Sequence, residues 1–262
     1  MFILFPRGNK IDWCIMLSLD LSSQVWAITG NLGGGKTLTA VSIAVDSIRR
    51  GYFVITNITL NTSILSRFVG KSAPQLYQHI SMDDDIDFYT LPCGSPRGSR
   101  GRKRVLVIID EVAEWMDQYQ SARDGKVARF LSWLRHSSKR SQDVFLICQR
   151  ADYINKSLRI LVSRWVFVRD LAVYRLPVLH MRIPFCRDKV LQTVFDRMGN
   201  RISGLMMVSK REYGIYYDTA ECLNSSAGVY GEYSLPLKRP PRFLLLFALW
   251  FFSWLIAIAY AT

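Results

Sequence analysis

The sequence predicts an α/β fold in which a parallel sheet is flanked by helices. Apolar runs of strand length alternate along the chain with segments whose apolar residues recur at helical spacing, a pattern typical of parallel sheets covered on both faces. A glycine-rich loop also stands between the first of these strands and the first of these helices, which is the setting of a phosphate-binding loop. A chain of 262 residues is long enough for one such domain and a small appendage.

The composition is basic. Lys and Arg outnumber Asp and Glu by 34 to 21, which gives a formal net charge of +13, and no charged residue follows Arg242. A nucleic acid or an anionic membrane surface suits such a charge, and a solvated basic surface is the alternative. The five cysteines form no C-x-x-C pair, so neither a zinc site nor a disulfide framework is indicated. Cys148 falls in an apolar run and is expected to be a buried, reduced thiol.

Residues 1–23 form a leader to which we assign no function. The apolar run before Pro6 is too short for the core of a signal peptide, and no A-x-A cleavage pattern follows it. We expect these residues to be an N-terminal extension of the protein, with Met16 as an alternative start residue. The first strand is expected at Val25 to Thr29, and the first helix over Leu38 to Ile48.

The loop between them, Thr29 to Leu38, reads TGNLGGGKTL and fits the Walker A pattern G-x-x-x-x-G-K-[ST]. Its glycines leave backbone N–H groups free to surround phosphate oxygens. Lys36 adds a positive charge at the β- and γ-phosphates, and Thr37 supplies a hydroxyl ligand for Mg²⁺. A chance GKT in a glycine-rich turn is disfavoured because a strand and a helix flank the loop. The predicted nucleotide-binding residues are Gly30, Asn31, Leu32, Gly33, Gly34, Gly35, Lys36, Thr37 and Leu38.

The second strand is expected at Gly51 to Leu60, with Asn57 at its C-terminal end. Because ligands gather at the C-terminal ends of parallel strands, Asn57 is a candidate for nucleotide or substrate contact, and capping of a turn is the alternative. Residues 94–104 form a Gly/Ser/Arg-rich loop with five cationic side chains. Nucleic acid, phospholipid headgroups and an acidic partner are its candidate contacts, and a solvated linker is the alternative.

A continuous apolar run at Val105 to Ile109 is followed directly by Asp110 and Glu111, which is the Walker B pattern. An aspartate in this position holds Mg²⁺, and a glutamate next to it polarises the attacking water. Because the pair follows a Walker A loop in the same chain, the two motifs together predict a site that hydrolyses a nucleotide.

A helix with an apolar face is expected over Lys126 to Lys139, and basic residues gather at its end. Arg135 and Arg140 are candidates for an arginine finger that reaches the γ-phosphate bound to a neighbouring subunit. Cations placed against the negative end of the helix dipole are an equally weighted alternative. His136 fits a packing or capping role.

Two more buried strands are expected, at Asp143 to Cys148 and at Arg164 to Val168. In P-loop ATPases with a glutamate beside the Walker B aspartate, the former strand lies between the Walker A and Walker B strands. Gln149 at its tip can therefore sense the γ-phosphate. Residues 171–237 are less regular, with strand-like runs at 205–210 (LMMVSK) and 214–219 (GIYYDT). A small subdomain or an interaction surface is expected there.

The segment from Phe243 to Ala261 carries no charge over the length needed to span a bilayer. A transmembrane helix is therefore expected at 243–262. Basic residues flank only its N-terminal side, which the positive-inside rule places in the cytoplasm, and Pro240 and Pro241 separate it from the domain. The expected parts are thus the leader (1–23), the ATPase core (24–170), the remainder of the cytoplasmic domain (171–237), a basic linker (238–242) and the membrane helix (243–262).

Taken in order, these segments resemble the zonular occludens toxin (Zot-like) family, which includes the assembly ATPases of filamentous phages. The resemblance rests on the loop at Gly30, the strand ending in TN at 56–57, IIDE followed by Trp115, WLRH, DVFLICQ and, most specifically, YYDT…SSAGVY before a basic stretch and one membrane span. It implies a RecA-like P-loop ATPase. The family's nucleotide positions are matched by Gly30, Lys36, Thr37, Asp110, Glu111 and Gln149.

The resemblance further implies an oligomeric, ring-forming motor of the bacterial inner membrane that hydrolyses ATP with Mg²⁺ to assemble and extrude phage. Its domain would face the cytoplasm and its C-terminus the periplasm. Implied partners are further copies of the chain, phage coat proteins, phage single-stranded DNA or its protein complex, and the host inner membrane. Family members commonly continue into a periplasmic region, whereas this sequence stops at Thr262, so a separate outer-membrane channel or periplasmic connector is also expected.

Two rival functions remain open from the sequence. The first is a Zot-like toxin or interaction protein, which the complete ATPase site and the lack of a signal peptide disfavour. The second is a membrane scaffold that binds nucleotide without hydrolysing it, and a measurement of turnover separates it from a motor.

Overall fold

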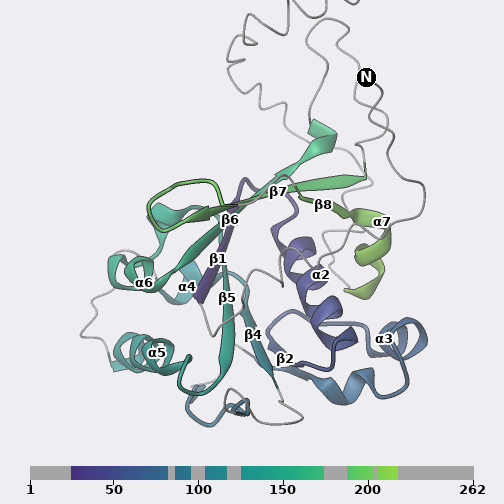
Figure 1. Ribbon diagram of the computed structural model, residues 1–262, viewed down its shortest axis with the longest axis horizontal. Helices are drawn as coiled ribbons and strands as arrows, with labels where there is room; N and C mark the ends of the chain where they lie inside the picture. The colour runs from purple at the N-terminus through teal and green to yellow at the C-terminus, as the bar shows by residue number, and fades with distance from the viewer. Residues whose placement is uncertain are drawn as a thin grey trace, which may run out of the picture. The chain divides into compact units, whose positions relative to one another are not determined.

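Helices lie on both sides of a central sheet in the computed structural model of the chain (Figure 1). The structure describes residues 25–81, 86–95, 104–116, 125–173, 188–202 and 206–217. All of them belong to the first of two structural units, Met1–Asp218 and Thr219–Thr262. The leader, the basic linker, the SSAGVY segment and the predicted membrane helix at 243–262 lie outside the described residues. Within the described ranges, no helix has the length and apolar character to cross a bilayer.

The sheet has eight strands in the order β3-β2-β4-β5-β1-β6-β7-β8. The first six of this order are parallel, whereas β7 and β8 are antiparallel. The central strands β1, β4 and β5 are buried along their whole length, because helices cover their apolar residues on both faces. The strands are β1 (Val25–Gly30), β2 (Phe53–Thr56), β3 (Tyr77–His79), β4 (Val105–Ile109), β5 (Gln142–Cys148), β6 (Arg164–Asp170), β7 (Lys189–Asp196) and β8 (Met206–Ser209).

Two hydrophobic cores form, one on each face of the sheet. One face is covered by α2 (Lys36–Arg49), α3 (Thr62–Phe68) and α7 (Lys210–Tyr213), and the other by α4 (Val112–Trp115), α5 (Gly125–His136) and α6 (Lys156–Leu161) (Figure 1). Successive residues of β1 serve the two cores in turn, as the alternation of side chains along a strand requires. Trp26 and Ile28 pack against the first set of helices, and Val25 and Ala27 against the second.

The strand order brings the predicted site segments together at the C-terminal ends of the parallel strands. β5 pairs with β1 on one side and with β4 on the other, with Thr29 opposite Cys148 and Ile109 opposite Leu146. This confirms the prediction that the Gln149 strand lies between the Walker A and Walker B strands. The chain leaves β1 for strands on one side and returns to β6 on the other, and a ligand crevice is expected at the C-terminal edge beside such a reversal.

The sheet is mostly parallel, as predicted, and departs from the prediction in two strands at one side. β7 and β8 pair antiparallel with β6 and with each other, and β7 was not among the predicted strands. Its inward-facing positions are Val190, Gln192 and Val194, so a polar residue interrupts the apolar pattern that marks a half-buried strand. The pairing with β6 therefore left little signal in the local sequence.

Two further local predictions were wrong. The second strand ends at Thr56 instead of reaching Leu60, because the Ile58 N–H turns back to the Thr56 hydroxyl at 3.1 Å. The run that starts at Gly214 is helical, not extended, since Gly214–Tyr216 forms a 3-10 turn directly after α7. Tyr213 and Tyr216, which are three positions apart, are both buried there, as helical spacing allows.

Candidate active site

The loop between β1 and α2 requires glycine at both of its ends. Gly35, directly before α2, has a φ of 88°, a left-handed conformation that residues with a Cβ rarely adopt. A Cβ at Gly35 would lie 2.7 Å from Val190 Cγ2 of β7, and a Cβ at Gly30 would lie 2.3 Å from the Val168 carbonyl oxygen of β6. Side chains are therefore excluded beneath the loop, while residues 31–33 at its tip are exposed to solvent.

Lys36 is the first residue of α2 and is bent back over the loop. Its Nζ donates hydrogen bonds to the carbonyl oxygens of Gly30, at 3.1 Å, and of Asn31, at 2.9 Å. The ammonium charge thus stays beside the loop backbone. Leu32 is 82% exposed at the tip of the loop, whereas Leu38 is 5% exposed and packs in the core. The Leu38 side chain is therefore not placed to meet a nucleotide.

Thr37 and Asp110 come together although 73 residues separate them in the chain. The Thr37 hydroxyl donates to Asp110 Oδ2 at 2.9 Å, and Asp110 Oδ1 accepts the Glu111 N–H at 2.9 Å. The two predicted Mg²⁺ ligands are therefore neighbours. A hydroxyl and a carboxylate are oxygen donors of the kind that Mg²⁺ prefers, so the residues present fit this ion.

Glu111 follows β4 with its backbone in the left-handed conformation, at φ 56° and ψ 39°. Within the described ranges, Ser141 is the other non-glycine residue with positive φ. Such a conformation costs about 1–3 kcal/mol and persists only where its surroundings impose it. The bend ends β4 and starts α4, and it leaves the Glu111 side chain exposed at the C-terminal edge of the sheet.

Gln149 follows β5 at the same edge and is exposed. Its carbonyl oxygen accepts a hydrogen bond from the Thr29 hydroxyl of β1 at 3.1 Å. The residue before it, Cys148, is a free thiol buried in the core, as predicted. Burial raises the pKa of the Cys148 thiol to about 11, and contacts with Thr29 and the charges of Lys36 and Arg159 offset this only in part.

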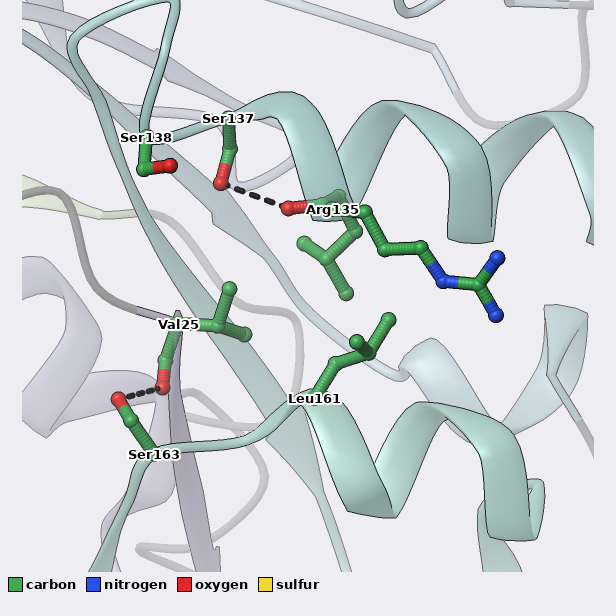
Figure 2. A pocket seen from close by; sticks show the side chains of 7 residues that line it. Val25, Arg135, Ser137, Ser138, Leu161 and Ser163 are labelled. Carbon is green, nitrogen blue, oxygen red and sulfur yellow. Dashed lines mark hydrogen bonds between the residues drawn. The ribbon is translucent and has the colours of Figure 1, made fainter.

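The two predicted finger arginines lie near the N-terminal ends of the parallel strands, away from the phosphate loop. Arg135 lies in the last turn of α5 and lines a cavity of about 210 Å³ together with Val25, at the start of β1, and Ser163, just before β6 (Figure 2). Arg140 stands two residues before β5. Because the phosphate loop follows the opposite end of β1, neither arginine reaches the loop of its own chain. Action on a neighbouring subunit stays a prediction.

The surroundings of these two arginines differ. Arg140 Nη2 donates to the carbonyl oxygens of Tyr89, at 2.8 Å, and of Leu91, at 2.7 Å, and the guanidinium lies 5.8 Å from the centre of the Tyr89 ring. Arg135 is exposed and forms no hydrogen bond or ion pair with any residue that the structure describes. Arg140 is therefore bound to the 89–91 segment of its own domain, whereas Arg135 is exposed to solvent.

Two polar side chains make contacts near the site that the sequence did not predict. Asn57, predicted only as a candidate for ligand contact, holds the main chain of Asp110 with both amide atoms, at 2.7 and 3.0 Å. Gln192 on β7 donates from Nε2 to the Thr39 hydroxyl in the first turn of α2, at 3.1 Å. The position of Asn57 at a strand end gave a signal. Nothing in the sequence around Gln192 indicated that β7 lies against α2.

Comparison with known proteins now gives a family. A sequence model of the family described as zonular occludens toxin (Zot) matches residues 24–207. The Gene 1 protein of Enterobacteria phage M13 is 25% identical over 234 residues, which cover 84% of this chain and 66% of that relative. The Gene 1 protein of Escherichia phage If1 is 29% identical over 157 residues, which cover 59% of this chain and 44% of that relative. The chain thus spans 66% of the length of the first relative.

One solved structure shares the family's description. The N-terminal domain of zonular occludens toxin from Neisseria meningitidis aligns with a TM-score of 0.44 and 19% sequence identity, over 74% of this chain and 98% of that one.

Proposed function

The chain belongs to the zonular occludens toxin (Zot) family, and on this premise we propose that it is a membrane-anchored ATPase that drives the assembly and extrusion of a filamentous phage. The observation that carries the enzymatic part is the 2.9 Å hydrogen bond from Thr37 to Asp110. It joins the phosphate loop and the Walker B carboxylates, which are distant in sequence, into a single site. The phage sources of the Gene 1 relatives support the biological setting.

ATP and Mg²⁺ suit the residues at this site. The loop accepts no side chain at Gly34, where a Cβ would lie 2.8 Å from the Asn31 carbonyl oxygen, and the Gly34 N–H donates to that oxygen at 2.9 Å. We propose that other backbone N–H groups of the loop bind phosphate oxygens. Lys36 would exchange its loop carbonyls for the β- and γ-phosphates. Thr37 and Asp110 would hold Mg²⁺, which when bound neutralises charge on the phosphates.

Hydrolysis is an in-line attack of water on the γ-phosphorus. The water oxygen forms the new P–O bond while the bond from phosphorus to the β,γ-bridging oxygen breaks, and ADP leaves with that electron pair. Glu111 orients the water and accepts its proton. The loop and Lys36 stabilise the charge on the phosphate oxygens, and Gln149 at the tip of β5 contacts the γ-phosphate.

We place this RecA-like domain in a homo-oligomeric ring, in which Arg135 of one subunit acts on the nucleotide of the next. Its exposure and its lack of partners among the described residues favour it over Arg140. Arg135→Ala should bind ATP normally and hydrolyse it slowly, and mixing it with Lys36→Ala subunits should restore part of the turnover. Arg140→Ala serves as the control, because its expected defect is in stability. Normal turnover by assembled Arg135→Ala rings would exclude the finger.

The cell's inner membrane is the proposed location, with the domain in the cytoplasm and the C-terminus in the periplasm. The uncharged segment 243–261 and the basic residues that precede it support this topology. Coat proteins, phage single-stranded DNA or its protein complex, and an outer-membrane channel or periplasmic connector are the proposed partners. Protease added to right-side-out spheroplasts should leave residues 1–237 intact, and digestion of this domain from outside would reverse the topology.

The decisive test of the enzymatic function is phosphate release by the full chain, extracted in detergent and supplied with Mg²⁺ and ATP. The wild type should turn over, and Glu111→Gln should bind ATP yet release almost no phosphate, because an amide cannot accept the proton. A wild type that binds ATP without hydrolysing it would point to a nucleotide-binding scaffold. A Glu111→Gln variant with wild-type turnover would remove this residue from the mechanism.

A further inference from the structure

Asn57 continues the pairing of two strands beyond the point where one of them ends. β2 stops at Thr56, which pairs with Ile108 of β4. The next residue, Asn57, then bonds Asp110 with its side chain. Its Oδ1 accepts the Asp110 N–H at 2.7 Å, and its Nδ2 donates to the Asp110 carbonyl oxygen at 3.0 Å. The side-chain amide thus takes the place of a peptide group of the neighbouring strand.

These bonds fix the peptide plane from which Glu111 departs. The carbonyl that Asn57 binds belongs to the peptide between Asp110 and Glu111, and the N–H of the same peptide donates to Asp110 Oδ1 at 2.9 Å. Rotation of this plane would break a hydrogen bond at either end. These hydrogen bonds therefore help to hold Glu111 in its left-handed conformation.

Asn57 is itself held by its neighbours. It is half-buried, and its carbonyl oxygen lies 3.2 Å from His79 Nε2 at the end of β3. The same His79 nitrogen lies 3.4 Å from the Thr59 hydroxyl. Because both atoms of the Asn57 amide already bond the main chain of Asp110, the geometry favours positioning over direct contact with a nucleotide.

We infer that Asn57 is a positioning residue that acts through Glu111 and sets the place of its carboxylate relative to the attacking water. This inference rests on the proposed ATPase function and deepens it. Asn57 has no hydrogen bond to the phosphate loop or to Lys36 among the contacts of the described residues. A change at Asn57 should therefore slow hydrolysis and leave ATP binding intact.

The test compares two asparagines in the full chain extracted in detergent. Asn57→Ala should lower kcat by about 10- to 100-fold, because a small misplacement of a catalytic group has effects of this size, while KM stays near the wild-type value. Asn61→Ala is the matched control. Its side chain caps α3 by accepting the Ile64 N–H at 3.1 Å, so it should affect stability and leave kcat near wild type.

A double-mutant cycle separates positioning from a general structural defect. If Asn57 acts through Glu111, then Asn57→Ala should reduce single-turnover hydrolysis strongly in the wild type and hardly at all in the Glu111→Gln background. An effect of equal factor in both backgrounds would mean that Asn57 acts independently of Glu111, and the inference would be wrong.

Hydrogen exchange supplies a readout that does not need turnover. The Asp110 amide should exchange faster in Asn57→Ala than in the wild type or in Asn61→Ala, because it loses its acceptor. If the wild type itself releases no phosphate, the proposed ATPase function fails, and the positioning role falls with it even where exchange increases. If the wild type hydrolyses ATP and Asn57→Ala keeps full kcat, the inference alone is overturned.

Discussion

Helix α2 has a carboxylate near each end, and the protein treats the two in opposite ways. At the first turn, Thr37 donates to Asp110, which is half-buried at the open edge of the sheet. Near the last turn, Asp46 is 7% exposed and is enclosed. The Tyr213 hydroxyl lies 3.1 and 3.0 Å from its two oxygens, and Arg49 Nη1 donates to it at 2.8 Å.

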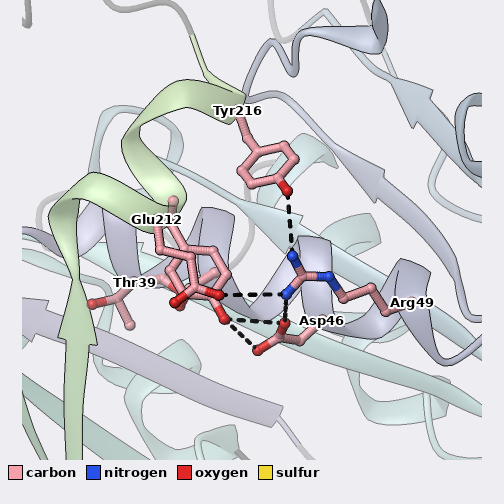
Figure 3. A network of polar contacts seen from close by, with 7 residues as sticks. Thr39, Asp46, Arg49, Glu212 and Tyr216 are labelled. Carbon is pink, nitrogen blue, oxygen red and sulfur yellow. Dashed lines mark hydrogen bonds and ion pairs between the residues drawn. The ribbon is translucent and has the colours of Figure 1, made fainter. Parts of the chain in front are cut away.

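Arg49 links the Asp46 contacts to two further residues near the end of the described part of the chain. Its Nη2 donates to the Tyr216 hydroxyl at 3.3 Å, and its Nη1 lies 3.8 Å from Glu212 (Figure 3). We call Asp46, Arg49, Tyr213 and Tyr216 the α2–α7 cluster. Because the two tyrosines belong to residues 210–216, the cluster fastens this segment to the helix that begins at the phosphate loop.

The contrast separates a carboxylate that the fold itself encloses from one that lies at the candidate site. Burial raises the pKa of Asp46, and the hydrogen bonds from Tyr213 and Arg49 lower it only in part. Burial likewise raises the pKa of Tyr213, so its hydroxyl stays protonated and donates. Asp46 is therefore supplied with partners by the protein itself. Asp110 is half-buried beside the exposed Glu111, at the C-terminal ends of the parallel strands.

The largest expected effect on turnover comes from the N-terminal end of α2, at the phosphate loop. Lys36→Ala should reduce turnover by about 100-fold or more, since it removes a charge aimed at the transferred phosphate, while the free energy of unfolding changes little. Lys156→Ala is the matched control, because this exposed lysine is also the first residue of a helix, α6. Phosphate release and thermal unfolding measure the two effects. Equal turnover in both variants would contradict the assignment.

Changes near the C-terminal end of α2 should affect stability and leave turnover nearly unchanged. Tyr213→Phe removes the hydroxyl that bonds both oxygens of buried Asp46 and should lower the free energy of unfolding by about 1–3 kcal/mol. Tyr216→Phe, which loses one longer bond to Arg49, should cost less. Urea unfolding gives both values, and turnover should stay near wild type where the variants are folded. A greater loss for Tyr216→Phe would reverse the ranking of the two tyrosines.

The raised pKa of Asp46 predicts a dependence of stability on pH. The folded state keeps the proton to a higher pH than the unfolded chain, whose ordinary value is 3.8. Between these two pKa values the folded state binds more protons, so stability falls as the pH rises through this range. The difference in unfolding free energy between wild type and Asp46→Asn should therefore shift against the wild type from pH 3.5 toward neutrality. A shift in the opposite direction would mean that the pKa is lowered.

The smallest expected effect is a difference in chemical reactivity between two cysteine thiols, one of them next to the candidate site. Cys148 is buried next to Gln149, and its pKa is raised to about 11, whereas Cys93 is exposed. Iodoacetamide at pH 8 should alkylate Cys93 and leave Cys148 unmodified until the chain is unfolded. Mass spectrometry of the peptides measures both. Rapid labelling of Cys148 in the folded protein would show that the floor of the site is open to solvent.

The candidate site was predictable to the extent that its residues are adjacent in sequence. The strand, loop and helix around Lys36 were found from local pattern, and so was the run that ends at Asp110. The hydrogen bond between Thr37 and Asp110 follows from these motifs once β1 and β4 lie in one sheet. The roles of Asn57 and Arg140 did not follow, because each depends on the main chain of a distant segment, at Asp110 and at Tyr89 and Leu91.

The sequence by itself determined the central strands, the helices on both faces and the position of the phosphate loop, because apolar periodicity and glycine content act over a few neighbouring residues. Only the tertiary structure decided that β7 runs antiparallel to β6 and that its Val190 leaves no room for a side chain at Gly35. It also decided that Tyr213 caps a buried aspartate on α2. Such contacts depend on which surfaces meet after the chain has folded, and a polar residue has the same local pattern whether its partner is water or a distant side chain.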